Sequence, residues 1–465
     1  MIDYKELGFK AGLECHQQIE CAKLFCSCPS LVNDEHDADI FFERKLRAAA
    51  GETGKVDEAA KFEMDKDKTF LYEGCSSSCC LVEMDEEPPH EVNMHALRTA
   101  LEVALLFNCK ILSQVHFMRK TVVNGSNVCG FQRTALIAVD GYINSSKGRV
   151  KIDTICLEEE AAKKLENKDN VRYRLDRLGV ALVEIATDAS IKDAEHAKEV
   201  ASLIGMILRS TGKVKRGLGT IRQDVNVSIR GHPRVEIKGF QELRSMPKII
   251  EFEVLRQKEE KNGVSHVRKA NADGTTTYSR PMPGAARMYP ETDIPVIDIS
   301  PSLIDSIKLP ERFDEKVLRI EKEFGLNSDL ARQVVEEDLD LSLYKFKNVD
   351  YKFVVNCLLN YPKEILKRYN LNASGLDYKE VLGYLDKQLI SKEAVMEILV
   401  EKIKTGKVDL SKYKAVDDSS LEDELKKIIS ENKGASMNAL MGEAMKKLRG
   451  KVDGKKIMDA LKKLV

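Results

Sequence analysis

Acidic side chains and one imidazole occur together near the start of this 465-residue chain. In the segment GLECHQQIE, Glu14, His16 and Gln18 are two residues apart. If the segment is a β-strand, the three side chains share one face, because successive side chains of a strand point to opposite faces. Carboxylates with one imidazole suit an oxygen-preferring divalent ion such as Mg²⁺, which usually also binds phosphate oxygens.

Two further segments carry groups of the same kind. ICLEEEAAKK places three consecutive glutamates, residues 158–160, at an expected strand-to-helix junction, and RVEIKG sets Glu236 beside Lys238. Any one of these groups alone is more often a solvated strand face. Spacing in the sequence does not by itself bring the three segments together.

The cysteines form a separate set. There are eleven, an odd number, in a large chain whose start shows no export signal, so a disulfide framework is not expected. Two close groups could instead form a tetrahedral zinc site. The alternative is that they are buried free thiols. These residues are Cys26, Cys28, Cys75, Cys79 and Cys80.

Several common catalytic signatures are missing from the sequence. It contains no G-x-x-x-x-G-K-[ST], no G-x-G-x-x-G, no G-x-S-x-G and no H-E-x-x-H. If the protein uses a nucleotide, it therefore does not bind it through a P-loop.

Charge is balanced overall, with 74 basic and 75 acidic residues, which excludes a uniformly basic nucleic-acid coat. Two local stretches are basic: residues 209–222 hold five basic residues and no acid, and residues 433–465 hold nine basic and three acidic residues. Such stretches indicate a polyanion bound at particular places, or else solvated helix faces. No apolar run is long enough for a membrane helix, and we expect a cytoplasmic protein.

The elements that must position these groups follow from periodicity. Alternation in residues 220–230 and 234–240 predicts a hairpin with one apolar and one polar face. Helices are expected at 95–107, 196–209 and 242–260. We therefore predict an α+β protein: a large α+β body at 1–300, an all-α helical domain at 301–412 and a small basic helical tail domain at 413–465, with residues 412–424 looking like a linker.

Long motifs run through the chain in a fixed order: GLECHQQIECAKLFCSCPS, CLVEMDEEPPH, HFMRKTVVNGSNVCGFQRTALIAVDGYI, TICLEEEAA, YRLDRLGVALVEIATD, TGKVKRGLGTIRQDVNVSIRG, VEIKGFQEL and RPMPGAARMYPETDIP. In this order they resemble the family of B-type and E-type subunits of glutamyl-tRNA(Gln) amidotransferase, and its archaeal E-type members in particular. The stretch ASMNALMGEAMKKLRGKVDGKKI resembles that family's tRNA-binding tail.

The resemblance implies that the body at 1–300 is a mixed-sheet, cradle-like catalytic domain that uses ATP and Mg²⁺. It also implies a reaction and its machinery. ATP phosphorylates the side-chain carboxylate of glutamate on tRNA(Gln), and ammonia then displaces the phosphate to give Gln-tRNA(Gln). The match implies a Mg²⁺ shell of His16, Glu159 and Glu236. It implies that the catalytic residues are Glu14, His16, Lys120, Glu158, Arg222, Asp224 and Lys238. It implies that phosphates of the tRNA are bound by Lys446, Lys447, Arg449, Lys451 and Lys455.

The family also implies partners. Ammonia would come from an asparaginase-like partner, the D-type subunit, so we expect a hetero-oligomer. One departure stands out, because residues 261–279 occupy the place where the family usually carries an inserted domain related to one in bacterial aspartyl-tRNA synthetase. Two alternatives stay open: a B-type member of a three-subunit enzyme acting on Glu- or Asp-tRNA, and a non-catalytic tRNA-binding scaffold.

Overall fold

We analysed a computed structural model of the whole chain. It describes residues 2–31, 38–48, 54–165, 171–240, 242–260, 263–284, 288–311, 313–373, 375–413, 418–432, 435–448 and 454–464. The chain divides into two compact units, Met1–Arg312 and Phe313–Val465. The first contains the sheets and the second is helical. This confirms the expected α+β class.

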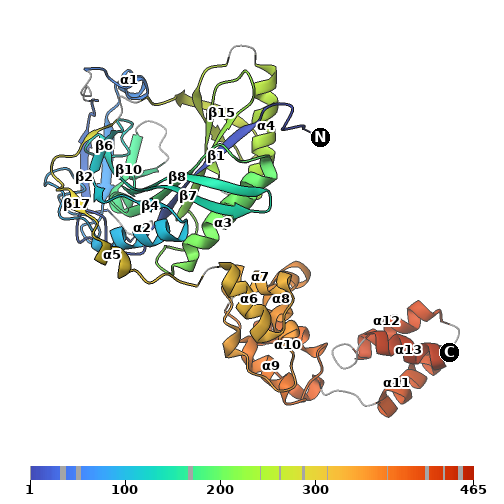
Figure 1. Cartoon of the computed structure of the whole chain (residues 1–465). Helices are drawn as coiled ribbons and strands as arrows, with labels where there is room; N and C mark the ends of the chain where they lie inside the picture. Colours follow the sequence, from blue (N-terminus) through green and yellow to red (C-terminus); the bar gives the residue numbers. More distant parts are fainter. Residues whose placement is uncertain are drawn as a thin grey trace. The chain divides into compact units, whose positions relative to one another are not determined.

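An eleven-stranded mixed sheet forms the centre of the first unit (Figure 1). Its main path runs β15-β14-β13-β12-β1-β11-β8-β7-β6-β16, and β4 pairs with β7. All pairs are antiparallel except β13 with β14. In chain order the strands are β1 (Lys10–Gln18), β4 (Lys110–Ile111), β6 (Phe117–Thr121), β7 (Phe131–Ser145), β8 (Gly148–Glu159), β11 (Ala181–Thr187), β12 (Ile221–Ser228), β13 (Val235–Phe240), β14 (His266–Ala270), β15 (Thr276–Pro281) and β16 (Met288–Pro290).

A second, four-stranded sheet has the order β2-β3-β10-β9, and β5 pairs with β17 separately. Phe70, Tyr72 and Tyr173 of the four-stranded sheet pack in a small aromatic core. These strands are β2 (Ile40–Arg44), β3 (Phe70–Gly74), β5 (Gln114–Val115), β9 (Lys163–Leu165), β10 (Val171–Arg174) and β17 (Ile297–Asp298).

Helices α2 (Met94–Leu106), α3 (Ala194–Ser210) and α4 (Met246–Glu259) share one hydrophobic core with the large sheet. They confirm the three helices expected in this part of the chain, with shifts of a few residues at the ends. Side-chain caps explain two of the starts: Asn93 accepts hydrogen bonds from the first amides of α2, and Asp193 accepts one from the backbone N–H of His196 in α3. The remaining helices of the unit are α1 (Glu58–Met64) and α5 (Pro301–Asp305).

A β-hairpin follows α4, at the position where the resemblance led us to expect a missing inserted domain. The chain leaves α4 and returns as β14 and β15, which pair with each other and extend the edge of the large sheet beside β13. Short strands at a sheet edge need only backbone hydrogen bonds and a turn, so few residues suffice. The large sheet is thus continuous across this position.

The first unit ends at Arg312, beyond the expected boundary at residue 300. The reason is that Leu303 and Ile304 of α5 pack against the core of the large sheet. A further division of the second unit at residues 412 and 413 stays a prediction.

The second unit is built from helices alone in its described residues. They are α6 (Phe313–Phe324), α7 (Ser328–Glu336), α8 (Tyr351–Tyr369), α9 (Tyr378–Asp386), α10 (Ala394–Thr405), α11 (Asp418–Glu431), α12 (Met437–Leu448) and α13 (Gly454–Leu464). Nowhere in the described parts of the chain is a helix both long and apolar enough to cross a bilayer.

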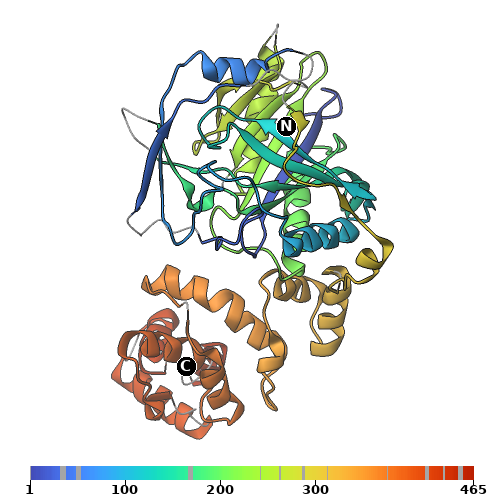
Figure 2. The same ribbon diagram turned by 90° about the vertical axis from the view of Figure 1, so that its left-hand side faces the viewer.

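One expectation about this unit was wrong. The charged segment 412–424 was expected to be a linker, but α11 begins at Asp418. Leu421, Leu425 and Ile428 recur at helical spacing and are buried against α12 and α13. The three last helices lie together in both views (Figures 1 and 2) and enclose this small core.

Candidate active site

The large sheet has an apolar face, which packs on α2, α3 and α4, and an opposite polar face. β1 lies between β11 and β12, and its register aligns Glu14 with Asp224 and His16 with both Glu184 and Arg222. Because side chains alternate along each strand, these five share the polar face, while the alternate residues of β1 belong to the core. The sheet therefore gathers residues that lie far apart in the sequence.

His16, Glu158 and Glu184 form the first group on this face, which we call the histidine cluster. The Nε2 atom of His16 lies 3.1 Å from Oε2 of Glu184 and 4.0 Å from Oε2 of Glu158. Their ligand atoms all lie within 4.8 Å of one another, a spacing that could hold a metal ion. The side chain of Glu158 is almost fully buried, and those of His16 and Glu184 are largely buried.

Lys120 and Gln132 complete the surroundings of the histidine cluster. Nζ of Lys120 lies 2.6 Å from Oε1 of Glu158 and 3.8 Å from Oε2 of Glu184. The amide of Gln132 donates to Glu158 Oε2 at 3.1 Å. A single ammonium group thus bridges the two carboxylates that flank His16.

The neighbouring charges in the histidine cluster shift the pKa values of His16 and Glu184. Burial works against the charged form of His16, but the hydrogen bond and charge of Glu184 and the charge of Glu158 outweigh it and raise the pKa of the imidazole. Burial also works against ionisation of Glu184, yet Lys120 and the hydrogen bond from His16 hold the pKa of that carboxyl well below its usual range. Glu184 therefore stays an ionised, metal-competent ligand.

Glu14, Asp224 and Glu236 form a second group, the carboxylate cluster, whose ligand oxygens also lie within 4.8 Å of one another. Nζ of Lys238 lies 2.6 Å from Oδ2 of Asp224 and 2.6 Å from Oε1 of Glu236. Here, too, a lysine bridges two carboxylates. The two clusters are adjacent, because Glu14 and His16 are next to each other on the polar side of β1.

Burial, followed by the negative charges of Glu184 and Glu236, raises the pKa of Glu14 to about 7. Lys238 opposes this rise but does not cancel it. For Lys238 itself, the charges of Asp224, Glu236 and Glu14 outweigh burial and raise the pKa of its ammonium group. A cation near Glu14 would favour the carboxylate over the carboxylic acid.

Arg222 lies on the polar face and forms an ion pair with a further acid, Glu160. Its guanidinium lies 2.6 Å from Oε2 of the buried Glu160, which also accepts from Gln18 at 3.4 Å. Burial disfavours the charged form of Glu160, but Arg222 and Arg177 outweigh it and lower the pKa of this carboxyl. The ion pair with Glu160 thus holds Arg222 on the strand beside His16.

The structure does not bring Glu159 to this face. Oε1 of Glu159 accepts the backbone N–H of Arg133 at 2.8 Å, and Oε2 lies 3.5 Å from that guanidinium. Arg133 in turn pairs with Glu291 at 2.8 Å. The expected shell of His16, Glu159 and Glu236 is therefore corrected. Because side chains alternate along β8, Glu158 and not Glu159 lies beside His16. Glu236 lies in the carboxylate cluster.

A second correction concerns the chain after Glu160. We expected a helix there, but β8 is followed by the short strand β9, Lys163–Leu165, which pairs with β10. The three consecutive glutamates have different partners: Lys120 for Glu158, Arg133 for Glu159 and Arg222 for Glu160.

Sequence reasoning missed Glu184 and Gln132. Glu184 stands in the mostly apolar strand ALVEIAT, and it is the only charged residue there. A lone carboxylate in a buried strand is a recognisable signal, because burying it without a partner is costly. Gln132 gave no comparable signal.

The donors on the polar face fit divalent cations. The histidine cluster offers two carboxylates and an imidazole, and the carboxylate cluster offers three carboxylates, all oxygen-rich sets that Mg²⁺ accepts. Lys120 and Lys238 already lie among these acids, which shows that both clusters attract positive charge.

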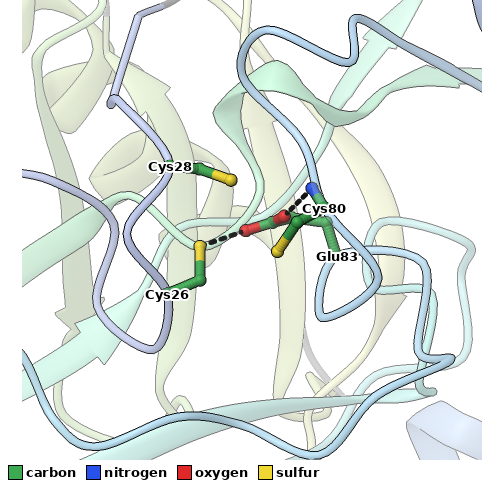
Figure 3. A group of neighbouring side chains, drawn as sticks. All are labelled: Cys26, Cys28, Cys80 and Glu83. Atoms are coloured by element: carbon green, nitrogen blue, oxygen red, sulfur yellow. Dashed lines mark hydrogen bonds between the residues drawn. The ribbon is translucent and has the colours of Figure 1, made fainter.

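The cysteines separate into two places. Cys26, Cys28 and Cys80 lie together with Glu83, with all four ligand atoms within 4.8 Å of one another (Figure 3). The other two expected zinc ligands lie elsewhere: Cys75 Sγ accepts from Arg174 at 2.9 Å, and Cys79 Sγ lies 4.0 Å from Lys23. Among the described residues, neither belongs to a group that could hold a metal.

Of the expected tRNA-binding residues, two have described side chains. Lys446 pairs with Glu443 at 2.6 Å and Lys447 with Glu431 at 3.0 Å, both on the exposed side of α12. Lys455 lies in α13, but its side chain is outside the described residues, as are Arg449 and Lys451 entirely. The tRNA-binding role of this surface stays a prediction.

Comparison with known families covers most of the chain. The model for the GatB/GatE catalytic domain matches residues 9–305, and the model described as the GatB domain matches residues 343–465. The first match includes every residue of the histidine and carboxylate clusters, and the second includes α8 to α13.

Curated relatives match over nearly their whole length. The E-type subunit of glutamyl-tRNA(Gln) amidotransferase from Methanosarcina acetivorans is 36% identical over 622 residues, covering 99% of this chain and 98% of the relative. The proteins of the same name from Archaeoglobus fulgidus and Methanocaldococcus jannaschii are each 35% identical, covering 100% and 99% of this chain and 99% of each relative. The aligned spans exceed this chain's 465 residues, so part of each relative has no counterpart here. By these matches, the chain belongs to the GatB/GatE family.

Proposed function

We propose that this chain is the part of a tRNA-dependent amidotransferase that converts Glu-tRNA(Gln) to Gln-tRNA(Gln). The observation that carries the proposal is the polar face of the sheet, where two metal-competent acid clusters and two bridging lysines lie within the part that matches the GatB/GatE catalytic domain. The names of the curated relatives support the same substrate.

The reaction needs an activated acid, because a carboxylate is a poor acyl electrophile. A side-chain carboxylate oxygen of the glutamyl group attacks the γ-phosphorus of ATP, and ADP leaves. Ammonia then attacks the acyl carbon, and phosphate leaves with the oxygen that the carboxylate supplied. Neither step requires a covalent protein nucleophile; both require positioning and stabilisation of phosphate charge.

The residues for this chemistry fall into the two clusters. His16, Glu158 and Glu184 would hold one Mg²⁺, and the carboxylate cluster would hold a second. Bound Mg²⁺ would neutralise charge on the phosphates of ATP and help to align them. Glu184, kept ionised by Lys120 and His16, would remain a ligand across the physiological pH range.

The basic residues would bind the transferred phosphoryl group and the carboxylate. Lys120 now bridges Glu158 and Glu184, and Lys238 bridges Asp224 and Glu236. When metal ions satisfy those acids, both ammonium groups can turn to phosphate oxygens, since a lysine side chain is flexible. Arg222, fixed by Glu160, would offer a permanent positive charge beside them.

Two partners follow from the proposal. The ammonia would come from an amidase partner, an asparaginase-like D-type subunit in the archaeal arrangement, so the working enzyme is a hetero-oligomer. The basic surface of the last helices would bind tRNA phosphates and position the acceptor end without reading sequence. ATP, Mg²⁺ and charged tRNA are thus the small set of ligands that the chain must bind.

A second candidate has one observation in its favour. The relatives are longer than this chain within the aligned span, and a shorter outline is also expected of a B-type member of a three-subunit enzyme. Such an enzyme would also accept Asp-tRNA(Asn). The partner distinguishes the two: an asparaginase-like protein supports the first, and an amidase-signature protein with a small third chain supports the second.

The test is a transamidation assay with the full chain, free ammonium, ATP, Mg²⁺ and either Glu-tRNA(Gln) or Asp-tRNA(Asn). Formation of Gln-tRNA(Gln) alone supports the proposal. Formation of Asn-tRNA(Asn) as well supports the second candidate. Binding of tRNA with no ATP-dependent phosphate release would leave only a non-catalytic scaffold.

A further inference from the structure

The loop that joins α3 to β12 carries positive charge that the proposed chemical steps do not use. Its residues, 211–220, include three basic side chains and no acidic one. Lys213 pairs with the buried Glu102, and the ammonium group of Lys215 donates to the carbonyl of Ser30, so both lysines are turned toward the body of the protein. Arg216 is exposed and begins the outermost part of the loop, residues 216–219, which we call the loop tip.

The two ends of the loop tip are fixed to β1. The side chain of Gln17 is buried, and its amide nitrogen donates to the carbonyl of Lys215 at 3.0 Å and to that of Thr220 at 3.1 Å. Two backbone hydrogen bonds join the same residues to the end of the strand. The N–H of Lys215 donates to the carbonyl of Gln18 at 3.0 Å, and the N–H of Gln18 donates to the carbonyl of Thr220 at 2.9 Å. The loop tip therefore projects from a well-held base.

Leu218, in the loop tip, has a side chain that touches almost nothing. Its exposure of 104% is the highest of any large hydrophobic side chain in the described residues. It stands between Gly217 and Gly219, whose φ angles of +115° and +80° lie in the region that favours glycine. A Cβ atom at either glycine would meet nothing within 4 Å. The glycines are thus needed for the shape of the backbone, and that shape holds a leucine out in water, where it stabilises no core.

The loop tip lies next to the histidine cluster along the chain. β12 begins directly after the loop, and its second residue, Arg222, is aligned with His16 of β1. Leu218 precedes Arg222 by four residues, so their Cα atoms are at most about 14 Å apart. Gln18, which holds the base of the loop, also donates to Glu160, the acid that pairs with Arg222. The same strand end therefore supports both the loop tip and the edge of the polar face.

The substrate must bring an unpaired RNA end to this place. In Glu-tRNA(Gln) the glutamyl group is esterified to the terminal adenosine, so a glutamyl carboxylate at the histidine cluster places the last nucleotides close to it. Those nucleotides are single-stranded, and their bases expose apolar faces. Proteins bind such strands by packing apolar or aromatic side chains on the bases and by placing cations along the phosphates. A loop tip with an uncovered leucine, an arginine and no acid offers both kinds of contact.

We propose, on the basis of the function proposed above, that the loop tip binds the single-stranded end of the tRNA. Leu218 packs against an unpaired base, and Arg216 pairs with a phosphate beside it. No covalent bond is made or broken in this contact. Both are positioning residues, because they hold the end of the RNA and do not touch the reacting carboxylate. The absence of acidic residues from the loop favours a polyanion over a protein partner as the ligand.

The experiment measures binding of deacylated tRNA(Gln) to the full chain without ATP. Two forms of the RNA are compared, one complete and one lacking its last three nucleotides. The variants are Leu218→Ala and Arg216→Gln. The matched control is Leu255→Ala, because Leu255 is also an exposed leucine but lies on α4, which packs on the opposite, apolar face of the sheet. Dissociation constants are measured across a salt series, and thermal unfolding of every variant is recorded.

We expect Leu218→Ala to weaken binding of the complete tRNA by about tenfold, since a leucine side chain is no longer buried against a base. Binding of the shortened tRNA should not change, because the base that Leu218 contacts is missing from it. Arg216→Gln should flatten the salt dependence for the complete tRNA by about 0.7 in slope, and again not for the shortened form. Leu255→Ala should match the wild type with both RNAs. Thermal unfolding should be unchanged in Leu218→Ala, because the side chain is fully exposed.

Three results would overturn the proposal. Unchanged binding of both RNAs by Leu218→Ala would show that the leucine does not contact tRNA. Equal weakening for both RNAs would place its contact elsewhere on the tRNA. Weaker association with the ammonia-supplying partner, with RNA binding unchanged, would assign the loop tip to a protein interface. The outcome is separable from that of the transamidation assay: binding that depends on Leu218 and on the RNA end, without any product, would reject the proposed reaction and keep this contact.

Discussion

Glu158 and Glu159 are neighbours in the sequence, but their side chains lie on opposite faces of β8. Glu158 pairs with Lys120 at 2.6 Å in the histidine cluster, whereas Glu159 accepts the backbone N–H of Arg133 at 2.8 Å behind the sheet. Burial raises the pKa of Glu159 even though Arg133 opposes the rise. Glu158 thus belongs to the polar face of the sheet, whereas Glu159 belongs to the opposite side.

This difference gives the first prediction. Glu158→Gln should lower ATP-dependent activation of Glu-tRNA(Gln) by about 10²–10³-fold, because it removes a charge that organises the phosphates. Glu159→Gln should keep most of the activity but lower the free energy of unfolding by about 1–3 kcal/mol, because Arg133 loses a buried ionic partner. Turnover and thermal unfolding measured on both variants check this. The reverse pattern would return Glu159 to the reacting face.

Lys120 offers a prediction that separates binding from chemistry. In Lys120→Met the acids Glu158 and Glu184 lose the ammonium group that bridges them. Mg²⁺ should then bind as tightly or more tightly, while turnover at saturating Mg²⁺ falls by about 10²–10³-fold. A Mg²⁺ titration of the phosphate-release rate gives both quantities. Unchanged turnover with weaker Mg²⁺ binding would mean that Lys120 only supports the metal ligands.

The pKa of Glu14, raised to about 7, predicts a pH dependence of metal binding. Below that pH Glu14 is a neutral acid, so a cation must displace its proton, and the apparent Mg²⁺ affinity of the carboxylate cluster should rise with pH up to about 7 and then level off. The change should approach about tenfold per pH unit on the acidic side. Glu14→Gln should remove this dependence, and a pH series of Mg²⁺ titrations on both proteins measures it. Equal slopes would exclude Glu14 as a ligand.

The last helices give a prediction about tRNA. Removing residues 416–465 takes away α11 to α13 with their own small core, so the rest of the chain should remain folded. Affinity for Glu-tRNA(Gln) should fall, and the slope of log affinity against log salt should flatten by about 0.7–0.9 per lost phosphate contact. Binding across a salt series measures this. Identical slopes would mean that Lys446 and Lys447 serve only their partners Glu443 and Glu431.

Much of the fold was predictable because its signals are local. Alternation in residues 220–230 and 234–240 correctly predicted β12 and β13 and their polar face. Val225, Val227 and Ile237 are buried, while Asp224 and Lys238 lie on the side of the clusters. The three long helices of the first unit follow from their apolar spacing and their caps. These patterns depend on residues a few positions apart.

The composition of each cluster was not predictable in the same way. Which glutamate meets His16 depends on the register of β8, β11 and β1, and a shift of one residue exchanges the two faces. Likewise, the grouping of Cys80 with Glu83 rather than with Cys79 depends on a turn whose partner loop is distant in the sequence. Pairing between distant segments leaves little trace in a single sequence.

The most direct test of the central claim follows an oxygen atom. Glu-tRNA(Gln) labelled with ¹⁸O in the glutamyl side-chain carboxylate is converted with ATP, Mg²⁺ and ammonium by the wild-type chain and by Glu158→Gln, and the released phosphate is analysed by mass spectrometry. If the polar face forms an acyl phosphate, wild-type phosphate carries one ¹⁸O atom for each Gln-tRNA(Gln) formed, and Glu158→Gln releases little phosphate. Amide product accompanied by unlabelled phosphate would contradict the account, because the carboxylate oxygen would then never have been bonded to phosphorus.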